Sequence, residues 1–390
     1  MILRRLFMVR KFLKSLLSLF LIAVIATGIS VACFFFIPEN KGNITPILLH
    51  RFMRKNNVNG MMIVSDNTGK PITISHGINR GEVETDIENN KLFPMASLQK
   101  LMTGIIIQRL IDQDVLSEDD RLSQFFPQVK GSNSITIHQL LTHTSGLREK
   151  GVKVSPYLKN EREQLQFCLK HYNFVNKKSW YYSNINFSFL TGIATQVTGR
   201  TYAELVDDVI KNPLRLDATQ SYQSVVNHDL VSPMRKNGKL NKINIFNQVS
   251  TAYGAGDFFT TPLNFWVLMR SFSKGYFFPT DEYTKHQNDA ISHYYGGLYM
   301  HGRIVNSNGA FFQYSSFGYA DLKTHDTMVL FMNNKVYSDA SHVAPKAFEY
   351  YQKFMFLNKI FHLVFYFVFS FLLMLLIRHS FRKRRYKKRH

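Results

Sequence analysis

The sequence has only two cysteines among its 390 residues, Cys33 and Cys168. A disulfide framework is therefore excluded. An exported domain without disulfides suits a bacterial surface, and a Gram-positive one in particular, better than a eukaryotic secretory route. Cys168 lies in QLQFCLKHY without any pattern that would support a nucleophile, so the sequence predicts a buried thiol there.

Acidic residues are also few: 27 Asp and Glu stand against 48 Lys and Arg, for a net charge of +21. Much of the excess lies at the two ends. Residues 1–14 carry five basic side chains and residues 378–390 carry eight, with no acid in either tail. The remainder has 35 basic and 27 acidic residues. Because the part of the chain between the two tails is only mildly basic, it is not a strongly cationic nucleic-acid-binding module. We therefore predict no nucleic-acid partner.

Charged residues are absent from two long apolar runs, 15–37 and 360–377. At about 1.5 Å per residue, the first run can cross a hydrocarbon core of about 30 Å, and the second also has the charge-free apolar composition of a membrane span, so we predict two transmembrane helices. The alternatives for the first run are a cleaved signal peptide or lipid attachment at Cys33, and the alternative for the second is an amphipathic surface helix. Both runs have their basic flank on the side away from the centre of the chain. The positive-inside rule then predicts a two-pass protein of the cell membrane.

This topology divides the chain into five parts. The basic tails 1–14 and 378–390 are predicted to be cytoplasmic, and residues 45–355 are predicted to form one extracellular domain between the two spans, 15–37 and 360–377.

Apolar periodicity predicts the fold of that domain. Residues 60–77 and 294–333 contain short aromatic and β-branched runs typical of antiparallel strands. Helical spacing predicts helices at 97–113 and 343–357, and residues 135–275 alternate helical segments with polar loops. The predicted fold class is α/β (α+β): an antiparallel sheet formed by both ends of the domain, flanked by helices, with an inserted mainly helical subdomain.

Three local signals in the sequence each predict a particular turn or helix end. Asp66-Asn67-Thr68-Gly69 predicts a hairpin turn. Thr136 and Gln139 have the spacing of a capping box, and Gly199 ends an apolar stripe as a C-terminal helix cap.

Ser97 and Lys100 are the first candidates for chemistry. Their spacing places a hydroxyl and an amine on one face at the start of a helix, where they can touch. Backbone N–H groups and the helix dipole favour negative charge at that end. Since Ser-x-x-Lys also arises by chance, the pair alone carries little weight.

The neighbourhood of this pair is more informative. It contains, in order, FPMASLQKLMTGIIIQRLIDQDVLSEDDRLSQFFP, SITIHQLLTHTSGL, WYYSNINFSFLTGIATQVTGRTY, NPLRLDAT and AYGAGDFFTTPLNF. Over residues 58–335 the chain resembles the penicillin-recognising serine hydrolases, specifically the class C β-lactamase-like branch of low-molecular-weight penicillin-binding proteins and related esterases.

The resemblance implies roles for four residues. Ser97 matches the acylated serine and Lys100 the lysine that helps to deprotonate it. Tyr182 matches the tyrosine that acts as a phenolate-like base and proton shuttle, and Asn184 matches the ligand of the acyl side chain. A lysine ammonium beside Tyr182 is expected to lower the pKa of its phenol.

A histidine and a serine that suggest a catalytic triad, His143 and Ser145, occur in the string Leu140-Leu141-Thr142-His143-Thr144-Ser145-Gly146-Leu147. In the resembled family this segment is a structural loop near the site. We therefore predict a packing or solvated histidine and no catalytic role.

The third family motif, Lys or His followed by a small residue and Gly, departs from the pattern. Aligning residues 313–316 with the usual Gly-aromatic-Ser-Ser places Ser307-Asn308-Gly309 at the motif, so its positive charge is missing. Nearby His301-Gly302-Arg303 lacks the glycine at the right place. These three motif residues remain the predicted substrate-binding set, and the backbone N–H groups of Ser97 and Ala310 remain the predicted oxyanion hole.

Losing that charge disfavours a substrate with a carboxylate, because a charge-assisted contact contributes about 1.5–3 kcal/mol. We predict a serine hydrolase acting on D-alanyl esters of teichoic acid, with a cell-envelope polymer and the membrane as partners. The alternatives are a D-alanyl-D-alanine carboxypeptidase or penicillin-binding protein, and a catalytically silent wall-binding scaffold. No cofactor and no metal are predicted, and the sequence makes no prediction of oligomeric state.

Overall fold

The computed structural model describes residues 44–77, 90–225, 230–233, 242–287 and 293–357, together with Leu17, Phe20, Leu21 and Val24. The chain divides into a main unit, Leu49–Glu349, and a second unit that joins Met1–Leu48 with Tyr350–His390. α2 (Ile44–Lys55) runs across the boundary between them.

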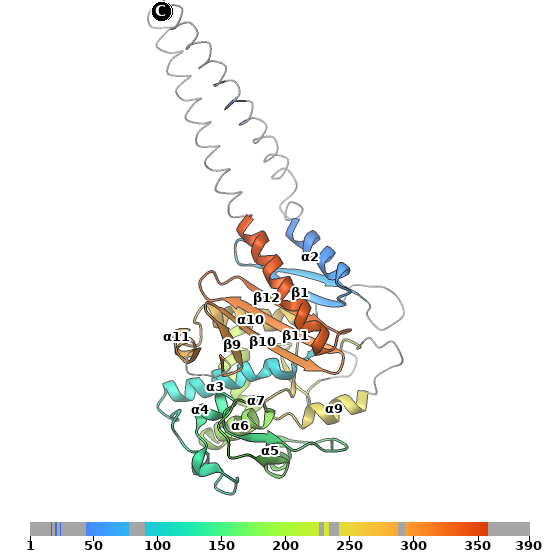
Figure 1. Cartoon of the computed structure of the whole chain (residues 1–390). Helices are drawn as coiled ribbons and strands as arrows, with labels where there is room; N and C mark the ends of the chain where they lie inside the picture. Colours follow the sequence, from blue (N-terminus) through green and yellow to red (C-terminus); the bar gives the residue numbers. More distant parts are fainter. Residues whose placement is uncertain are drawn as a thin grey trace, which may run out of the picture. The chain divides into compact units, whose positions relative to one another are not determined.

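An antiparallel sheet of seven strands forms the centre of the main unit as far as the structure describes it (Figure 1). Its strand order is β2-β1-β12-β11-β10-β9-β8. The strands are β1 (Gly60–Ser65), β2 (Pro71–His76), β8 (Tyr294–Tyr295), β9 (Leu298–His301), β10 (Ile304–Phe311), β11 (Tyr314–Asp321) and β12 (Thr327–Met332). β1 pairs with β12, with Gly60 opposite Met332. The prediction of one antiparallel sheet built from both ends of the domain is confirmed.

Helices cover both faces of the middle of this sheet. β1, β11 and β12 are buried along their whole length, which explains the continuous apolar runs of β1 and β12. α10 (Pro262–Ser273) packs on one face, where Gly318 leaves room for it: a Cβ at Gly318 would lie 2.7 Å from the ring of Phe265. On the other face Tyr319 stacks on Phe348, with ring centroids 4.9 Å apart. Phe348 belongs to a helix that includes residues 337–357.

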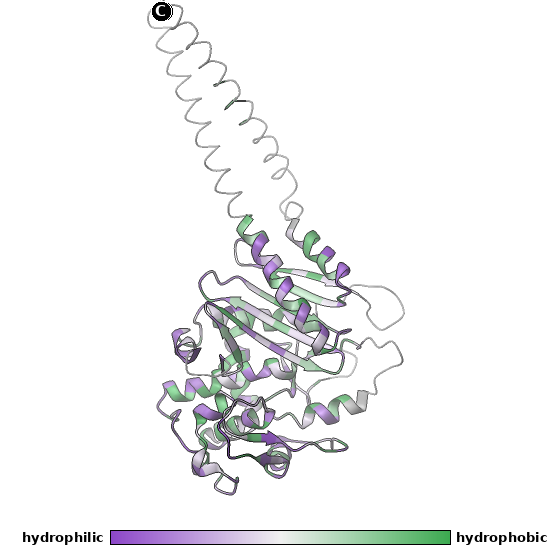
Figure 2. Ribbon diagram, viewed as in Figure 1, coloured by the Kyte–Doolittle hydropathy of each residue, from purple (hydrophilic) through white to green (hydrophobic). Residues whose placement is uncertain are grey.

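The chain between β2 and β8 is mainly helical, as predicted. Its α-helices are α3 (Lys100–Asp112), α4 (Ile137–Leu141), α5 (Glu161–Lys170), α6 (Asn184–Thr198), α7 (Tyr202–Val206), α8 (Asn212–Leu214), α9 (Lys242–Ser250), α10 and α11 (Asp281–Thr284). Short strands lie among them: β3 (Phe93–Pro94), β4 (Leu147–Glu149), β5 (Tyr172–Phe174), β6 (Gln220–Ser221) and β7 (Phe258–Thr260). Figure 1 shows α3 between the sheet and the helices α4, α5, α6 and α7. Outer helices such as α9 carry both hydrophilic and hydrophobic residues (Figure 2).

α3 is buried on almost every side, which its apolar stripe did not predict. Every residue from Lys100 to Gln108 is buried. Gly104 allows this close packing, because a Cβ there would lie 2.0 Å from the carbonyl oxygen of Gly296. The predicted helix 97–113 also begins differently, as a 3-10 helix, η1 (Ala96–Gln99), that continues into α3.

The three local signals are confirmed. Thr136 caps α4 in a capping box with Gln139. Gly199 ends α6 at a φ of 66°, in the left-handed region. The turn before β2 is held by the carboxylate of Asp66, which accepts hydrogen bonds of 2.8 Å from the backbone N–H groups of Thr68 and Lys70.

The predicted spans 15–37 and 360–377 lie outside the described residues, apart from the four isolated positions in the first span. Among the described helices, none is long and apolar enough to cross a membrane.

Candidate active site

Ser97 lies at a sharp turn that leads from β3 into η1 and α3. The residue before it, Ala96, has a φ of 46°, which side chains other than glycine seldom adopt. Such a conformation costs of order 1–3 kcal/mol and is kept only where the surroundings hold it. Gly256 packs directly on Ala96, since a Cβ on Gly256 would lie 3.3 Å from the Ala96 backbone. The turn leaves Ser97 half-buried while the rest of η1 is buried.

The Lys100 side chain is fully buried and reaches three oxygen atoms. Its Nζ donates to Oγ of Ser97 at 3.0 Å, to Oδ1 of Asn184 at 2.6 Å and to the carbonyl oxygen of Ala255 at 3.0 Å. These are all the hydrogen bonds that an ammonium can donate. The sequence prediction that Ser97, Lys100 and Asn184 lie together therefore agrees with the geometry.

Burial lowers the pKa of Lys100 to about 7, although the carboxylate of Glu149 acts in the opposite direction. A substantial fraction of the lysine is then neutral at neutral pH. A neutral Nζ has a lone pair that can accept the proton of the Ser97 hydroxyl over the same 3.0 Å contact. The arrangement can thus activate Ser97 as a nucleophile.

Tyr182 lies beside this pair, with its ring centroid 5.0 Å from Nζ of Lys100. Burial raises the pKa of its phenol far above the ordinary value, although a hydrogen bond with Ser97 acts in the opposite direction. The expectation that Lys100 lowers this pKa is wrong, because desolvation of the phenolate dominates. A neutral phenol in contact with Ser97 can relay a proton, whereas Lys100 is the better placed base.

The loop that contains His143 packs against Tyr182. The rings of His143 and Tyr182 lie 4.5 Å apart, and Nδ1 of His143 accepts a hydrogen bond of 2.9 Å from the amide of Asn186. Ser145 in turn donates to Oδ1 of Asn186 at 2.5 Å. Burial and the charge of Lys100 hold the pKa of His143 well below its usual value, so the ring is neutral. These contacts agree with the predicted packing role for His143.

The strand β10, which carries the third motif, runs directly beside Ser97. A Cβ at Gly309 would lie 2.6 Å from the carbonyl oxygen of Met95 and 3.1 Å from the backbone nitrogen of Ser97. Only glycine allows the strand to come this close. Ala310 follows, paired with Ser315 of β11, so the predicted oxyanion hole has its two residues on adjacent elements. Its geometry toward a substrate stays a prediction.

The other motif residues point in different directions. Ser307 is buried and its hydroxyl donates to the carbonyl oxygen of Gly297 at 3.0 Å. Asn308 is half-buried and lies on the opposite face of β10, because side chains alternate along a strand. Substrate binding by Ser307 and Asn308 stays a prediction. His301 is the last residue of β9, and Gly302 and Arg303 form the turn to β10.

A buried carboxyl group that the sequence did not reveal holds the start of α3 in place. Asp257 accepts hydrogen bonds from the side-chain amides of Gln99 at 2.6 Å and Gln164 at 2.8 Å. Gln99 also accepts a hydrogen bond from the backbone N–H of Phe258 at 2.8 Å. Burial raises the pKa of Asp257 to about 7. The string AYGAGDFF belongs to the family pattern, but only the fold shows that Ala255 and Asp257 position the nucleophile's helix.

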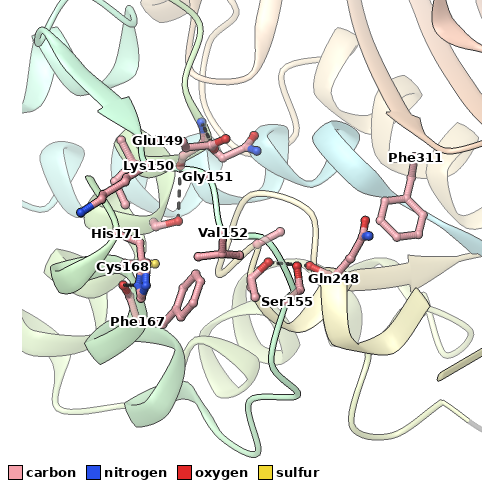
Figure 3. A pocket seen from close by; sticks show the side chains of 15 residues that line it. Glu149, Lys150, Gly151, Val152, Ser155, Phe167, Cys168, His171, Gln248 and Phe311 are labelled. Atoms are coloured by element: carbon pink, nitrogen blue, oxygen red, sulfur yellow. Dashed lines mark hydrogen bonds between the residues drawn. The ribbon is translucent and has the colours of Figure 1, made fainter. Parts of the chain in front are cut away.

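Glu149 is the second residue that the sequence did not reveal. Its Oε1 accepts a hydrogen bond of 2.8 Å from the backbone N–H of Asn184, the residue whose side chain contacts Lys100. Glu149 and Asn184 line a cavity of about 240 Å³, and Phe311, next to Ala310, lines the same cavity (Figure 3). The cavity therefore lies next to both the catalytic candidates and the third-motif strand. No local pattern around Glu149 indicates this position.

The pKa of Lys100 gives a prediction for pH dependence. The rate at which a fluorophosphonate acylates Ser97 should rise with pH around a midpoint of about 7, because the neutral amine is the active form and protonation below that pH removes it. The measurement is the second-order labelling rate between about pH 5 and about pH 9. A Lys100→Met variant should lose the inflection. A flat profile for the unmodified chain would contradict the assignment of Lys100 as the base.

Three comparisons with known proteins bear on this site. A curated relative, the teichoic acid D-alanine hydrolase of Staphylococcus aureus, is 27% identical over 221 residues, which cover 55% of this chain and 54% of the relative. The chain thus spans about half the length of the curated relatives it matches.

Solved structures share the fold. FmtA from Staphylococcus aureus has a TM-score of 0.67 at 23% identity, covering 78% of this chain and 89% of that one. The D-amino acid amidase from Ochrobactrum anthropi SV3 has a TM-score of 0.69 at 16% identity, covering 82% and 99%. A penicillin-binding protein from Bacillus halodurans has a TM-score of 0.60 at 19% identity, covering 76% and 99%.

The Beta-lactamase family profile matches residues 48–339, a range that contains the whole sheet and every residue of the candidate site described above. The chain therefore belongs to the Beta-lactamase family, in agreement with its resemblance to the penicillin-recognising serine hydrolases.

Proposed function

We propose that the protein is a serine acyl hydrolase that removes D-alanyl groups from teichoic acid through an acyl-enzyme on Ser97. The observation that carries this proposal is the 3.0 Å contact between Oγ of Ser97 and Nζ of a fully buried Lys100 whose pKa is lowered to about 7.

The proposed reaction has two half-reactions. Ser97 Oγ attacks the ester carbonyl and gives its proton to neutral Lys100, while the backbone N–H groups of Ser97 and Ala310 stabilise the oxyanion. Tyr182 donates a proton to the departing polymer oxygen, which leaves as an alcohol, and the Lys100 ammonium reprotonates Tyr182. Water then attacks the acyl-enzyme and gives a proton to neutral Lys100. Ser97 Oγ takes a proton from Tyr182 as D-alanine is released, and the Lys100 ammonium again reprotonates Tyr182.

The charges around the nucleophile support this substrate class. The motif position that carries a cation in the resembled family is Ser307, whose hydroxyl is bonded to Gly297. A carboxylate-bearing substrate would find no cation there. A D-alanyl ester has no carboxylate and carries an ammonium instead, and the similarity to a teichoic acid D-alanine hydrolase supports the same choice.

Glu149 is the proposed partner of that ammonium. It is linked to the nucleophile through Asn184, which it binds at 2.8 Å, and Lys100, which Asn184 binds at 2.6 Å. A carboxylate on the wall of the cavity favours a free amine over the neutral amide nitrogen of a peptide. A D-alanyl ester has this free amine, whereas the penultimate D-alanine of a stem peptide is acylated on nitrogen. Glu149 would therefore favour the ester.

Glu149→Gln should lower kcat/KM for a D-alanyl ester by about 10- to 100-fold, the value of one hydrogen bond to a charged group. The same change should leave the rate with an N-acetyl-D-alanyl ester nearly unaltered, because that substrate has no ammonium. Glu349→Gln, at an exposed helical position, is the matched control. Equal losses with both esters would show that Glu149 supports the fold of the site and does not select the amine.

The function itself is tested by D-alanine release. The purified full chain is incubated with D-alanylated lipoteichoic acid and, separately, with a muropeptide pentapeptide. Release from lipoteichoic acid that is lost in Ser97→Ala is the expected result. Release from the pentapeptide alone would favour a D-alanyl-D-alanine carboxypeptidase, and release from neither would favour a silent wall-binding scaffold.

We also propose that this catalytic domain, residues 45–355, is held outside the cell by transmembrane helices at 15–37 and 360–377, with cytoplasmic tails 1–14 and 378–390. The support is the absence of charge in both runs and the basic residues on their outer flanks. Protease treatment of intact spheroplasts should digest the domain and spare both tails. Digestion of the tails in intact spheroplasts would show that the topology is the opposite of the one proposed.

A further inference from the structure

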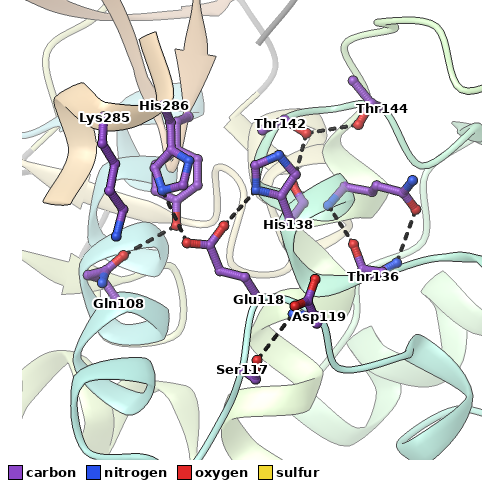
Figure 4. A network of polar contacts seen from close by, with 12 residues as sticks. Gln108, Ser117, Glu118, Asp119, Thr136, His138, Thr142, Thr144, Lys285 and His286 are labelled. Atoms are coloured by element: carbon purple, nitrogen blue, oxygen red, sulfur yellow. Dashed lines mark hydrogen bonds and ion pairs between the residues drawn. The ribbon is translucent and has the colours of Figure 1, made fainter. Parts of the chain in front are cut away.

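Three side chains from separate segments meet at a place that the proposed reaction does not use. Glu118 follows α3, His138 lies on α4, and His286 lies on the 3-10 helix η6 (Lys285–Gln287) (Figure 4). Oε2 of Glu118 lies 2.6 Å from Nδ1 of His138, and Oε1 lies 3.1 Å from Nε2 of His286. One ligand atom from each residue lies within 4.8 Å of the other two.

The backbone holds these side chains in place. The N–H of His138 donates to the carbonyl oxygen of Glu118 at 2.9 Å, and Ile137 donates to Asp120 at 3.1 Å, so the segment of Glu118 is tied to the start of α4. His286 is buried and its ring stacks on Tyr295, with centroids 3.9 Å apart and the planes inclined by 10°. The ligands are therefore oriented before anything binds, which is what a metal site requires.

The groups around Glu118 suit a cation, because both of its carboxylate oxygens face imidazole nitrogens, at 2.6 Å and 3.1 Å. The neighbouring Lys285 is engaged by Glu282 at 2.6 Å. His138 and Glu118 keep 31% and 20% of their side chains exposed, so an ion can enter from solvent.

We propose that Glu118, His138 and His286 form a binding site for a divalent transition metal, with Zn²⁺ as the preferred ion. Two imidazoles and one carboxylate are a common zinc donor set, with bonds of about 2.0–2.2 Å and water in the fourth position. Tetrahedral geometry at those lengths separates the ligand atoms by about 3.3 Å, which small side-chain movements can reach from the present distances. Binding replaces any proton on the two coordinating nitrogens, and these protons pass to water.

A bound metal would stabilise the structure around Ser97 and would take no part in the reaction itself. α4 leads directly to His143, whose ring packs 4.5 Å from that of Tyr182. Tyr295, on which His286 stacks, follows Tyr294, whose ring lies 4.8 Å from that of His143. A metal joining His138 to His286 would thus link the two segments that support Tyr182.

The test measures zinc on the full purified chain after chelator treatment and removal of the chelator. Titration followed by gel filtration and elemental analysis should give one Zn²⁺ per chain, and Zn²⁺ should raise the thermal unfolding temperature. Co²⁺ in its place should give the intense visible absorption of a tetrahedral site. Glu118→Gln and His138→Ala should each weaken Zn²⁺ affinity by at least about tenfold, since even outer-shell changes have that effect. His342→Ala, at an exposed position, should bind as the unmodified chain does.

Two results would overturn the proposal. One is the absence of stoichiometric Zn²⁺ on the unmodified chain, which would leave an ion-pair cluster only. The other is a Zn²⁺ affinity of His138→Ala equal to that of the unmodified chain, measured on a variant that circular dichroism shows to be folded. His138 is the variant of choice for this comparison because its ring is the more exposed of the two imidazoles.

Discussion

Replacing Lys100 with methionine should lower kcat/KM for a D-alanyl ester by about 10³-fold, within the range for loss of a general base. Methionine keeps the length and the burial of the side chain but has no nitrogen to take the proton of Ser97. The measurement is D-alanine release at pH 8, where the unmodified lysine is mostly neutral, since its pKa lies at about 7.

Two controls belong with this variant. Lys130→Met, at an exposed position, should keep full activity. The second control is thermal unfolding, which should show that Lys100→Met is folded. This check is needed because the substitution removes the hydrogen-bond donor of Ser97, Asn184 and Ala255. A folded variant with more than about a tenth of the original rate would mean that Tyr182 suffices as the base.

Gly309→Ala should lower the acylation rate by about 10²- to 10³-fold, the usual effect of losing an oxyanion-hole donor. The new methyl group would lie 2.6 Å from the carbonyl oxygen of Met95 and 3.1 Å from the nitrogen of Ser97, and both are backbone atoms that cannot swing away. The strand must then retreat from Ser97, and the N–H of Ala310 retreats with it. Single-turnover kinetics with a D-alanyl ester measure the acylation step directly.

Gly199→Ala separates this effect from a general loss of stability. Gly199 has a φ of 66°, and a methyl group added there would meet no atom within 4 Å, so its replacement strains the backbone without a clash. It should reduce stability and leave the rate of acylation unaltered. If Gly309→Ala were stable and equally active, the close approach of β10 to Ser97 would have no catalytic importance.

The parts of the fold that follow from local sequence were predictable. Continuous apolar runs such as GMMIVS and TMVLFM identified the central strands, and the capping box at Thr136 identified the start of α4. Ser97, Lys100 and Tyr182 were identified through family motifs whose spacing is visible in the sequence. The complete burial of α3 was not predictable, because it depends on elements on all sides of the helix and on Gly104.

Contacts between distant segments account for what the sequence did not reveal. Glu149 and Asn184 are 35 positions apart, and Gln99 and Asp257 are 158 apart, so neither pair leaves a local pattern. The cluster of Glu118, His138 and His286 likewise joins three segments. The pKa of Tyr182 was misjudged for a related reason: desolvation depends on how the whole site packs around the phenol, and the sequence shows only that a lysine is near.

The central claim is that Ser97 is a nucleophile activated by the groups around it, and covalent labelling tests it most directly. The full chain is treated with a fluorophosphonate and the modified residue is identified by mass spectrometry, with Ser97→Ala and Lys100→Met in parallel. We expect a single adduct on Ser97, absent from Ser97→Ala and formed far more slowly in Lys100→Met. An unmodified Ser97, or labelling that is equally fast without Lys100, would contradict the proposed site.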